Sequence, residues 1–71
     1  MELITVAETI KKRIEELERS LRRRGVQPWA LPLIHAECNG HLTTLRSGCR
    51  RHNHHQLRER IRRVRAAVAA L

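Results

Sequence analysis

The sequence predicts an all-α protein, a three-helix hairpin or bundle with heptad-like seams that is completed by dimerisation. Apolar residues recur in alternating steps of three and four along each third of the chain, as they do in packed helices. No stretch alternates apolar and polar residues in the manner of a half-buried strand. The 71 residues are expected to form one small domain, 1–71, and a domain of this size buries little core without a second copy or a partner.

A first helix is expected over residues 6–24. Thr5-x-x-Glu8 has the form of a capping box, which places the helix start near Val6. Arginines crowd the far end, where positive charge suits the negative pole of the helix dipole, and Gly25 is suited to the left-handed cap. The apolar seam of this helix consists of Leu3, Ala7, Ile10, Ile14, Leu17 and Leu21.

Residues 25–31, GVQPWAL, are expected to form a connector between the first two helices. The connector holds Trp29, the only aromatic residue of the chain. A lone tryptophan in such a position can plug the end of a small helical core, or it can anchor a partner at the surface. Both roles stay open for Trp29.

A second helix is expected over residues 32–51. Asn39-Gly40 lies in its middle, and a glycine there costs about 1 kcal/mol relative to alanine, so Gly40 is the place where a break is expected if one occurs. The seam of this helix consists of Leu31, Cys38, Leu42, Leu45 and Cys49, with Ile34 and His35 beside it.

A third helix is expected over residues 54–70, after the weaker capping box Asn53-x-x-Gln56. The chain then ends in AAVAAL, which is apolar on every side of a helix. A solvent-exposed helix end does not need such a surface, so a second copy or a partner is expected to cover it. The residues predicted for the dimer or partner interface are Leu3, Ile10, Ile14, Leu17, Leu21, Trp29, Leu57, Ile61, Val64, Val68 and Leu71.

The stretch HAECNGHLTTLRSGCRRHNHH holds every histidine and both cysteines. Its pairs His35-x-x-Cys38 and Cys49-x-x-His52 have the spacing of zinc ligands. In a continuous helix, however, Cys38 and Cys49 would lie about 16 Å apart at ~1.5 Å per residue, too far for one metal or for a disulfide. A zinc site would need the chain to fold back at residues 39–40 or 47–48. We therefore predict reduced core cysteines, and no metal or other cofactor.

Charge is distributed unevenly along the chain, which has a formal net charge of +8. Residues 1–24 carry seven basic and five acidic side chains, whereas residues 46–71 carry eight arginines and one glutamate. This asymmetry indicates an anionic partner for the C-terminal half, and arginine suits phosphate because its planar fork binds two oxygens at once. The residues predicted to bind nucleic acid are Arg46, Arg50, Arg51, Arg58, Arg60, Arg62, Arg63 and Arg65.

Helical spacing places Arg58, Arg62 and Arg65 on one flank of the third seam, with Arg60 and Arg63 on its outer face. Such a ridge would bind phosphate backbones by counterion release without reading their sequence. The expected function is therefore that of a non-enzymatic protein associated with nucleic acid. The alternative is an adaptor or small inhibitor that docks on a larger acidic protein, for example one of the replication or transcription machinery.

Catalysis is not expected, because the chain has no aspartate and no glycine-rich phosphate loop, and it is too short to build a cleft around a reactive cysteine. No apolar run resembles a signal peptide, and no stretch approaches the ~18–20 apolar residues of a membrane span. Two cysteines without a leader suggest a reducing compartment, so a cytoplasmic location is expected.

The stretch LERSLRRRG, followed by ECNGHL, resembles the N-terminal helices of the bacterial primosomal replication protein C family. In that family a leucine-rich first helix leads to a second helix with an arginine–phenylalanine–aspartate motif. Here Glu37-Cys38-Asn39 stands at that place, and the chain has no phenylalanine. The resemblance implies a replication-restart accessory that contacts other proteins and DNA.

Overall fold

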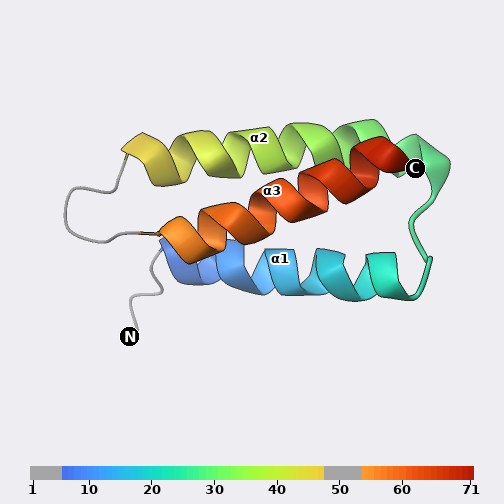
Figure 1. Cartoon of the computed structure of the whole chain (residues 1–71), viewed down its shortest axis with the longest axis horizontal. Helices are drawn as coiled ribbons and strands as arrows, with labels where there is room; N and C mark the ends of the chain where they lie inside the picture. The colour runs from blue at the N-terminus through green and yellow to red at the C-terminus, as the bar shows by residue number, and fades with distance from the viewer. Residues whose placement is uncertain (1–5, 48–53) are drawn as a thin grey trace.

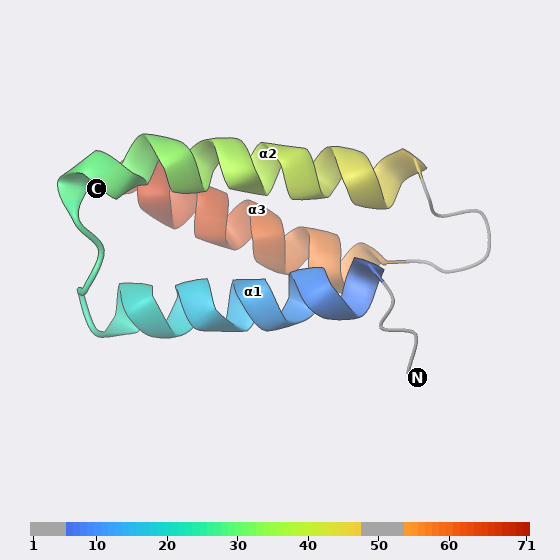
Figure 2. The same ribbon diagram turned by 180° about the vertical axis from the view of Figure 1, so that it is seen from behind.

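The computed structural model describes residues 6–47 and 54–71, which form an all-α fold with no strand. Three α-helices and one short 3-10 helix make up this part of the chain: α1 (Val6–Arg22), η1 (Pro28–Ala30), α2 (Leu31–Ser47) and α3 (His55–Ala70). Helices α1 and α2 run in opposite directions, and α3 lies across both of them (Figures 1 and 2). The predicted fold class, a three-helix bundle, is confirmed.

Helix α1 ends two residues earlier than predicted, in a cap that uses an arginine. The backbone N–H of Gly25 donates to the carbonyl of Ser20 over 3.0 Å, and that of Arg24 donates to Leu21 over 3.1 Å. These two bonds form a Schellman motif, whose left-handed residue is Arg24 with φ 55°. The prediction that Gly25 takes the left-handed conformation is therefore wrong, because the helix closes one residue earlier.

Helix α2 runs without interruption through Gly40, so the break considered at this position does not occur. A Cβ atom added to Gly40 would meet nothing within 4 Å, which shows that the glycine lies on an open face. The opposite face is held in the core by Ile34, Cys38 and Leu45, whose burial outweighs the low helix propensity of one glycine. The structure describes α2 from Leu31 to Ser47, and the predicted extension to residue 51 lies outside the described residues.

The core is built from the predicted seams of all three helices. Its buried residues are Ile10, Ile14, Leu17, Ile34, Cys38, Leu45, Ile61, Val64 and Val68. Leu21, Leu42 and Leu57 pack against this cluster and are partly buried. Six residues predicted for an interface between chains are thus buried within one chain, where a second copy cannot reach them.

Three of the other predicted interface residues lie elsewhere. Trp29 is 71% exposed, so it does not plug the core, and Leu71 is 75% exposed. Leu3 lies outside the described residues. Helix α3 ends beside η1 and the start of α2 in both views, so Leu71 and the connector share one end of the bundle (Figures 1 and 2). Across the described residues, no helix has the length and apolar character that a membrane crossing requires.

Candidate nucleic-acid interface

The arginines of α3 divide between two flanks of the helix, on either side of a buried stripe. The stripe consists of Ile61, Val64 and Val68. On the flank toward α2, positions 58, 62 and 65 follow the i, i+4, i+7 spacing of one helical face. On the flank toward α1 lie Arg60 and Arg63. The two flanks differ in what they meet on the opposite helix.

An arginine-lined cleft lies between α2 and α3, with a volume of about 370 Å³. The residues that line it are Asn39, Leu42, Thr43 and Arg46 from α2, and Arg58, Arg62 and Arg65 from α3. None of these described lining residues is acidic. We call this site the arginine cleft. Its positive charge is contributed by two helices that are far apart in the sequence.

Contacts within the arginine cleft fix two of its side chains without neutralising the nearby charge. Nη1 of Arg65 donates to Oδ1 of Asn39 over 2.7 Å, and an amide oxygen leaves the charge of the guanidinium intact. The hydroxyl of Thr43 donates to the backbone carbonyl of Asn39 over 3.0 Å, one turn earlier in α2. Asn39 therefore positions Arg65 while keeping the cleft positive.

Arg58 and Arg62 have different surroundings. Nε of Arg58 is buried and has no hydrogen-bond partner, so part of this guanidinium is withdrawn from water without a compensating acceptor. Arg62 contacts the carboxylate of Glu59 one turn earlier in α3, and both side chains are 40% exposed. Exposed pairs of this kind are weak, about 0–1 kcal/mol, so Arg62 can exchange this contact for a stronger anionic ligand.

Arg60, on the other flank, is engaged with α1. Its Nη2 lies 2.5 Å from Oε1 of Glu18 and its Nε lies 3.2 Å from Oε2, so the pair is bidentate. The hydrogen bond from Arg60 lowers the pKa of Glu18, against the opposing effect of burial, and the same bond raises the pKa of Arg60. The prediction that Arg60 lies on the outer face is wrong, because the acidic face of α1 lies opposite it. Arg63 is exposed, as predicted.

A second ion-pair cluster explains why the arginine cleft has no carboxylate from α2. Glu37, the one acidic residue of this helix, accepts hydrogen bonds from Arg13 of α1 over 2.8 Å and 3.1 Å. Nε2 of His41 lies 2.9 Å from the same carboxylate. The bond from Arg13 lowers the pKa of Glu37, burial opposes it, and the contact with His41 lowers it further. Glu37 therefore serves the contact between α1 and α2.

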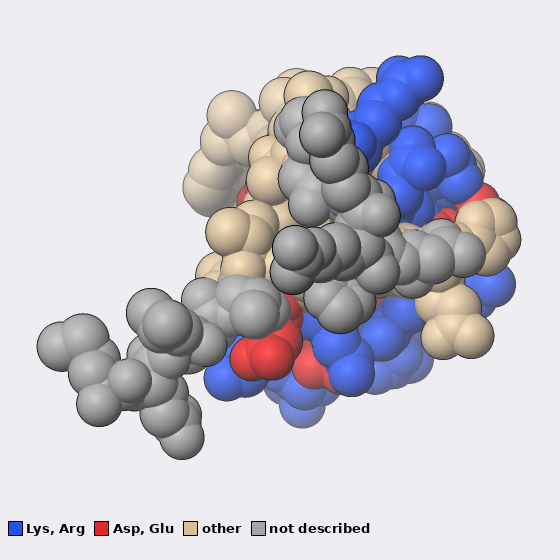
Figure 3. Space-filling model, turned by 90° about the vertical axis from the view of Figure 1, so that its left-hand side faces the viewer, with Lys and Arg blue, Asp and Glu red and all other residues tan. Residues whose placement is uncertain are grey.

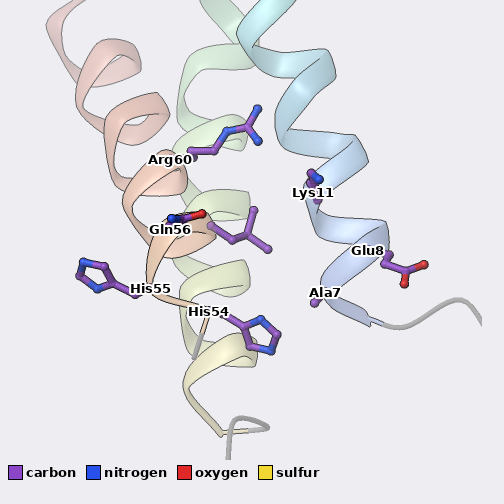
Figure 4. A pocket seen from close by; sticks show the side chains of 8 residues that line it. Ala7, Glu8, Lys11, His54, His55, Gln56 and Arg60 are labelled. Atoms are coloured by element: carbon purple, nitrogen blue, oxygen red, sulfur yellow. The ribbon is translucent and has the colours of Figure 1, made fainter. Parts of the chain in front are cut away.

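A larger cavity, about 530 Å³, lies between the starts of α1 and α3 (Figure 4). Arg60 extends toward α1 in this view, and His54 points toward Ala7, whereas His55 points away from α1. The lining includes Lys11 and Arg60, but the guanidinium of Arg60 is already held by the carboxylate of Glu18. This cavity is consequently less suited to phosphate than the arginine cleft, although it is larger.

Basic side chains are visible on both halves of the bundle when it is viewed from the end where α1 and α3 begin (Figure 3). Lys and Arg gather in the upper half of this view, where α2 lies, and along the lower edge, where α1 lies. Glu side chains lie beside the lower group and at the right-hand edge. Basic side chains are therefore present on both the α2 side and the α1 side of the bundle at this end.

The remaining predicted site residues are separated or lie outside the described ranges. Arg50, Arg51, Cys49 and His52 fall within residues 48–53, which the structure does not describe. Cys38 is fully buried in the core, as predicted, and burial raises the pKa of its thiol. His35 is exposed, and its Nδ1 lies 3.4 Å from Nδ2 of Asn39. Within residues 6–47 and 54–71, no three His, Cys, Asp or Glu side chains gather as metal ligands would.

The sequence analysis predicted Arg46 of α2 as a binding residue but missed Asn39, Leu42 and Thr43 as residues that line the cleft. Asn39, Thr43 and Arg46 follow the same i, i+4, i+7 spacing as the arginines of α3, so the two stripes meet face to face. The spacing shows that these three residues share one face of α2, but it does not show that this face lies opposite α3.

No protein family, curated protein or solved structure matches this chain. The function is therefore argued from the geometry of the arginine cleft and from the charges around it.

Proposed function

We propose that this protein is a non-enzymatic, cytoplasmic protein that binds the phosphate groups of nucleic acid in the arginine cleft. The observation that carries the proposal is the convergence of four arginines from two helices on one cavity, with no carboxylate among the described residues that line it. The described residues that line the cleft include no carboxylate, histidine or cysteine, and the hydroxyl of Thr43 donates to a backbone carbonyl, so binding is the activity proposed.

The energetic basis is the replacement of condensed counterions by guanidinium groups. Each phosphate that the protein neutralises releases counterions, and the affinity for duplex DNA then falls with a log–log salt slope of about −0.9 per phosphate. Charge-assisted bonds from arginine to phosphate oxygens contribute about 1.5–3 kcal/mol each. Contacts of this kind read no bases, so binding is expected to depend little on sequence.

The predicted phosphate-binding arginines differ in role under this proposal. Arg46, Arg58, Arg62 and Arg65 form the cleft, whereas Arg63 is exposed on the flank toward α1 and would contact a phosphate outside the cleft. Arg60 contributes least, because the carboxylate of Glu18 already holds its guanidinium. Arg50 and Arg51 stay in the proposal as flanking contacts on the strength of their charge alone.

The test is a duplex-binding titration with two charge-matched double variants. Arg58→Gln/Arg62→Gln removes two cleft arginines at i, i+4, and Arg19→Gln/Arg23→Gln removes two exposed arginines at the same spacing near the end of α1. The first variant is expected to lose affinity by about tenfold per arginine, whereas the second should lose far less. Equal losses would contradict a role for the cleft.

A pull-down from nuclease-treated lysate is run beside the titration. Absence of duplex binding at low salt, together with a protein partner that survives nuclease, would replace this proposal by the adaptor or inhibitor function.

Self-association is a further part of the proposal, and the homodimer remains its expected form. Trp29, Leu33 and Leu71 are each more than 60% exposed and are large apolar side chains. Since Leu71 and the connector lie at one end of the bundle, this end is the expected region of contact. Sedimentation equilibrium should give a mass above 8.3 kDa at tens of micromolar protein. A monomer at that concentration would contradict the dimer.

A further inference from the structure

In the arginine cleft several arginines line one cavity, whereas in an extended ridge they are spread along a surface. A ridge places each arginine beside a different phosphate along the strand. Here the stripe of α3 and the stripe of α2 line the same cavity of about 370 Å³. A cavity of this volume holds one small ligand the size of a nucleotide, and does not hold a row of nucleotides. The four arginines that line the cleft can therefore act on one phosphate group.

The charge of the cleft favours an anion with more than one negative charge. Four guanidinium groups share the cavity and no described carboxylate lines it, although one of the four, that of Arg62, also contacts the exposed carboxylate of Glu59. An internal phosphodiester carries a single charge, whereas a phosphomonoester carries about −1.5 to −2 at pH 7 and presents three strong acceptor oxygens. The monoester therefore neutralises more of the mutual repulsion among the arginines and accepts more of their hydrogen bonds.

Partial removal of water strengthens this preference. Nε of Arg58 is buried without an acceptor, and Leu42 supplies an apolar wall. Charges in such surroundings are screened less than charges on an open surface, so the difference between one and two negative charges on the ligand counts for more. Arg65 is already oriented by Asn39, which reduces the ordering that binding requires.

We infer that the arginine cleft binds the terminal phosphomonoester of a nucleic-acid strand in preference to its internal phosphates. This inference rests on the proposed function and specifies its ligand. The strand end supplies the doubly charged group, and the rest of the strand supplies further phosphates for other basic side chains of this chain, whose formal net charge is +8. The same chemistry exists in a free mononucleotide, which lacks those additional phosphates.

The test compares duplexes of one sequence that differ only in their ends. The full chain is titrated with duplexes carrying a 5′-phosphate, a 3′-phosphate or hydroxyls at all ends, and with a nucleoside monophosphate. A phosphorylated end is expected to bind about tenfold or more tightly than the all-hydroxyl duplex, and more tightly than the mononucleotide. Either phosphorylated end satisfies the inference, since the cleft recognises the phosphate group.

Variants locate the preference in the cleft. Arg62→Gln and Arg65→Gln are expected to abolish the difference between phosphorylated and hydroxyl ends, whereas Arg23→Gln should preserve it. Arg62→Lys keeps the charge but loses the bidentate fork, so it should retain only part of the difference. Circular dichroism of each variant verifies that the helices persist.

Three outcomes would overturn the inference, and they are distinguishable. Equal binding of phosphorylated and hydroxyl ends would remove the inference but leave the proposed function intact. Mononucleotide binding as tight as that of the phosphorylated duplex would make the cleft a site for small phosphate esters, not for strand ends. Absence of binding to every duplex would contradict both the inference and the proposed function.

Discussion

On the flank of α3 that faces α1, the guanidinium of Arg60 is held by both carboxylate oxygens of Glu18. On the flank that faces α2, three arginines of the same helix join Arg46 around a cleft with no acidic residue among its described lining. The difference arises on the opposite helix: α1 presents an acidic face to α3, while the only glutamate of α2 is engaged by Arg13. An arginine's role in this bundle is therefore decided by the surface that it meets.

The largest effect on duplex binding is expected from removing all four arginines of the cleft. Replacing Arg46, Arg58, Arg62 and Arg65 together by glutamine should weaken duplex binding by more than about a hundredfold, since each charge-assisted contact is worth about 1.5–3 kcal/mol. Fluorescence anisotropy with a labelled duplex at low salt measures the change. Replacing Arg19, Arg22, Arg23 and Arg24 removes the same charge outside the cleft. A loss of equal size there would mean that net charge, and not the cleft, governs binding.

Arg24 has a backbone conformation that is unfavourable for a residue other than glycine, so its replacement by glycine should stabilise the fold. Its φ of 55° is a conformation that costs a non-glycine residue about 1–2 kcal/mol, so Arg24→Gly should raise the free energy of unfolding, by up to about 1 kcal/mol after allowance for the flexible unfolded chain. Duplex binding should change by less than about threefold, because the removed charge lies outside the cleft. Chemical denaturation measures the first quantity.

Arg23→Gly is the matched control for this substitution, because Arg23 does not have a positive φ. It should leave stability unchanged or lower it. A gain in stability from Arg23→Gly equal to that from Arg24→Gly would show that the left-handed cap is not the cause.

The substitution Glu18→Gln removes the carboxylate that holds Arg60, so this arginine no longer faces an acidic side chain at position 18. Loss of the ion pair should lower the free energy of unfolding by less than about 1 kcal/mol, because both partners are partly exposed. It should also release Arg60 for phosphate, so that the magnitude of the salt slope rises by up to about 0.9. Titrations at four salt concentrations measure the slope. Unchanged binding would show that Arg60 cannot reach a phosphate even when it is released.

Acidification tests the two ion-pair clusters together through the pH dependence of stability. The pKa values of Glu18 and Glu37 are both lowered from 4.5 in the folded protein, chiefly by hydrogen bonds from Arg60 and Arg13. Such groups contribute stability that is fully present above the unfolded pKa and is lost as the pH falls through the lower, folded pKa. Stability should therefore decline below about pH 4.5. The Glu18→Gln/Glu37→Gln variant should show a shallower decline in urea unfolding, and an identical decline would mean that these two ion pairs are not its cause.

Much of the fold follows from local periodicity. The steps of three and four that run through Ile10, Ile14 and Leu17, and again through Ile61, Val64 and Val68, predicted the buried face of each helix. Such a pattern is decided within one helix, where residues three and four apart share a face. The burial of Cys38 followed from the same spacing.

The details that escaped prediction depend on contacts between distant segments. The pairing of Arg60 with Glu18 joins residues that are 42 positions apart, and it depends on which face of α1 lies opposite α3. The cleft itself needs the stripe of Asn39, Thr43 and Arg46 to face α3, which periodicity within one helix cannot decide. The cap at Arg24 was missed for a different reason: glycine is the usual left-handed residue, and here the motif ends one position before it.

The most direct test of phosphate binding in the cleft is the salt dependence of duplex binding for the two charge-matched double variants. Arg58→Gln/Arg62→Gln should reduce the magnitude of the log–log slope by about 0.9 for each phosphate that the variant no longer neutralises, whereas Arg19→Gln/Arg23→Gln should leave the slope within error of the wild type. Both variants have the same net charge, so a nonspecific decrease in attraction affects them equally. Equal slopes for the two variants, or a larger reduction for the α1 pair, would contradict the assignment of the arginine cleft as the phosphate-binding site.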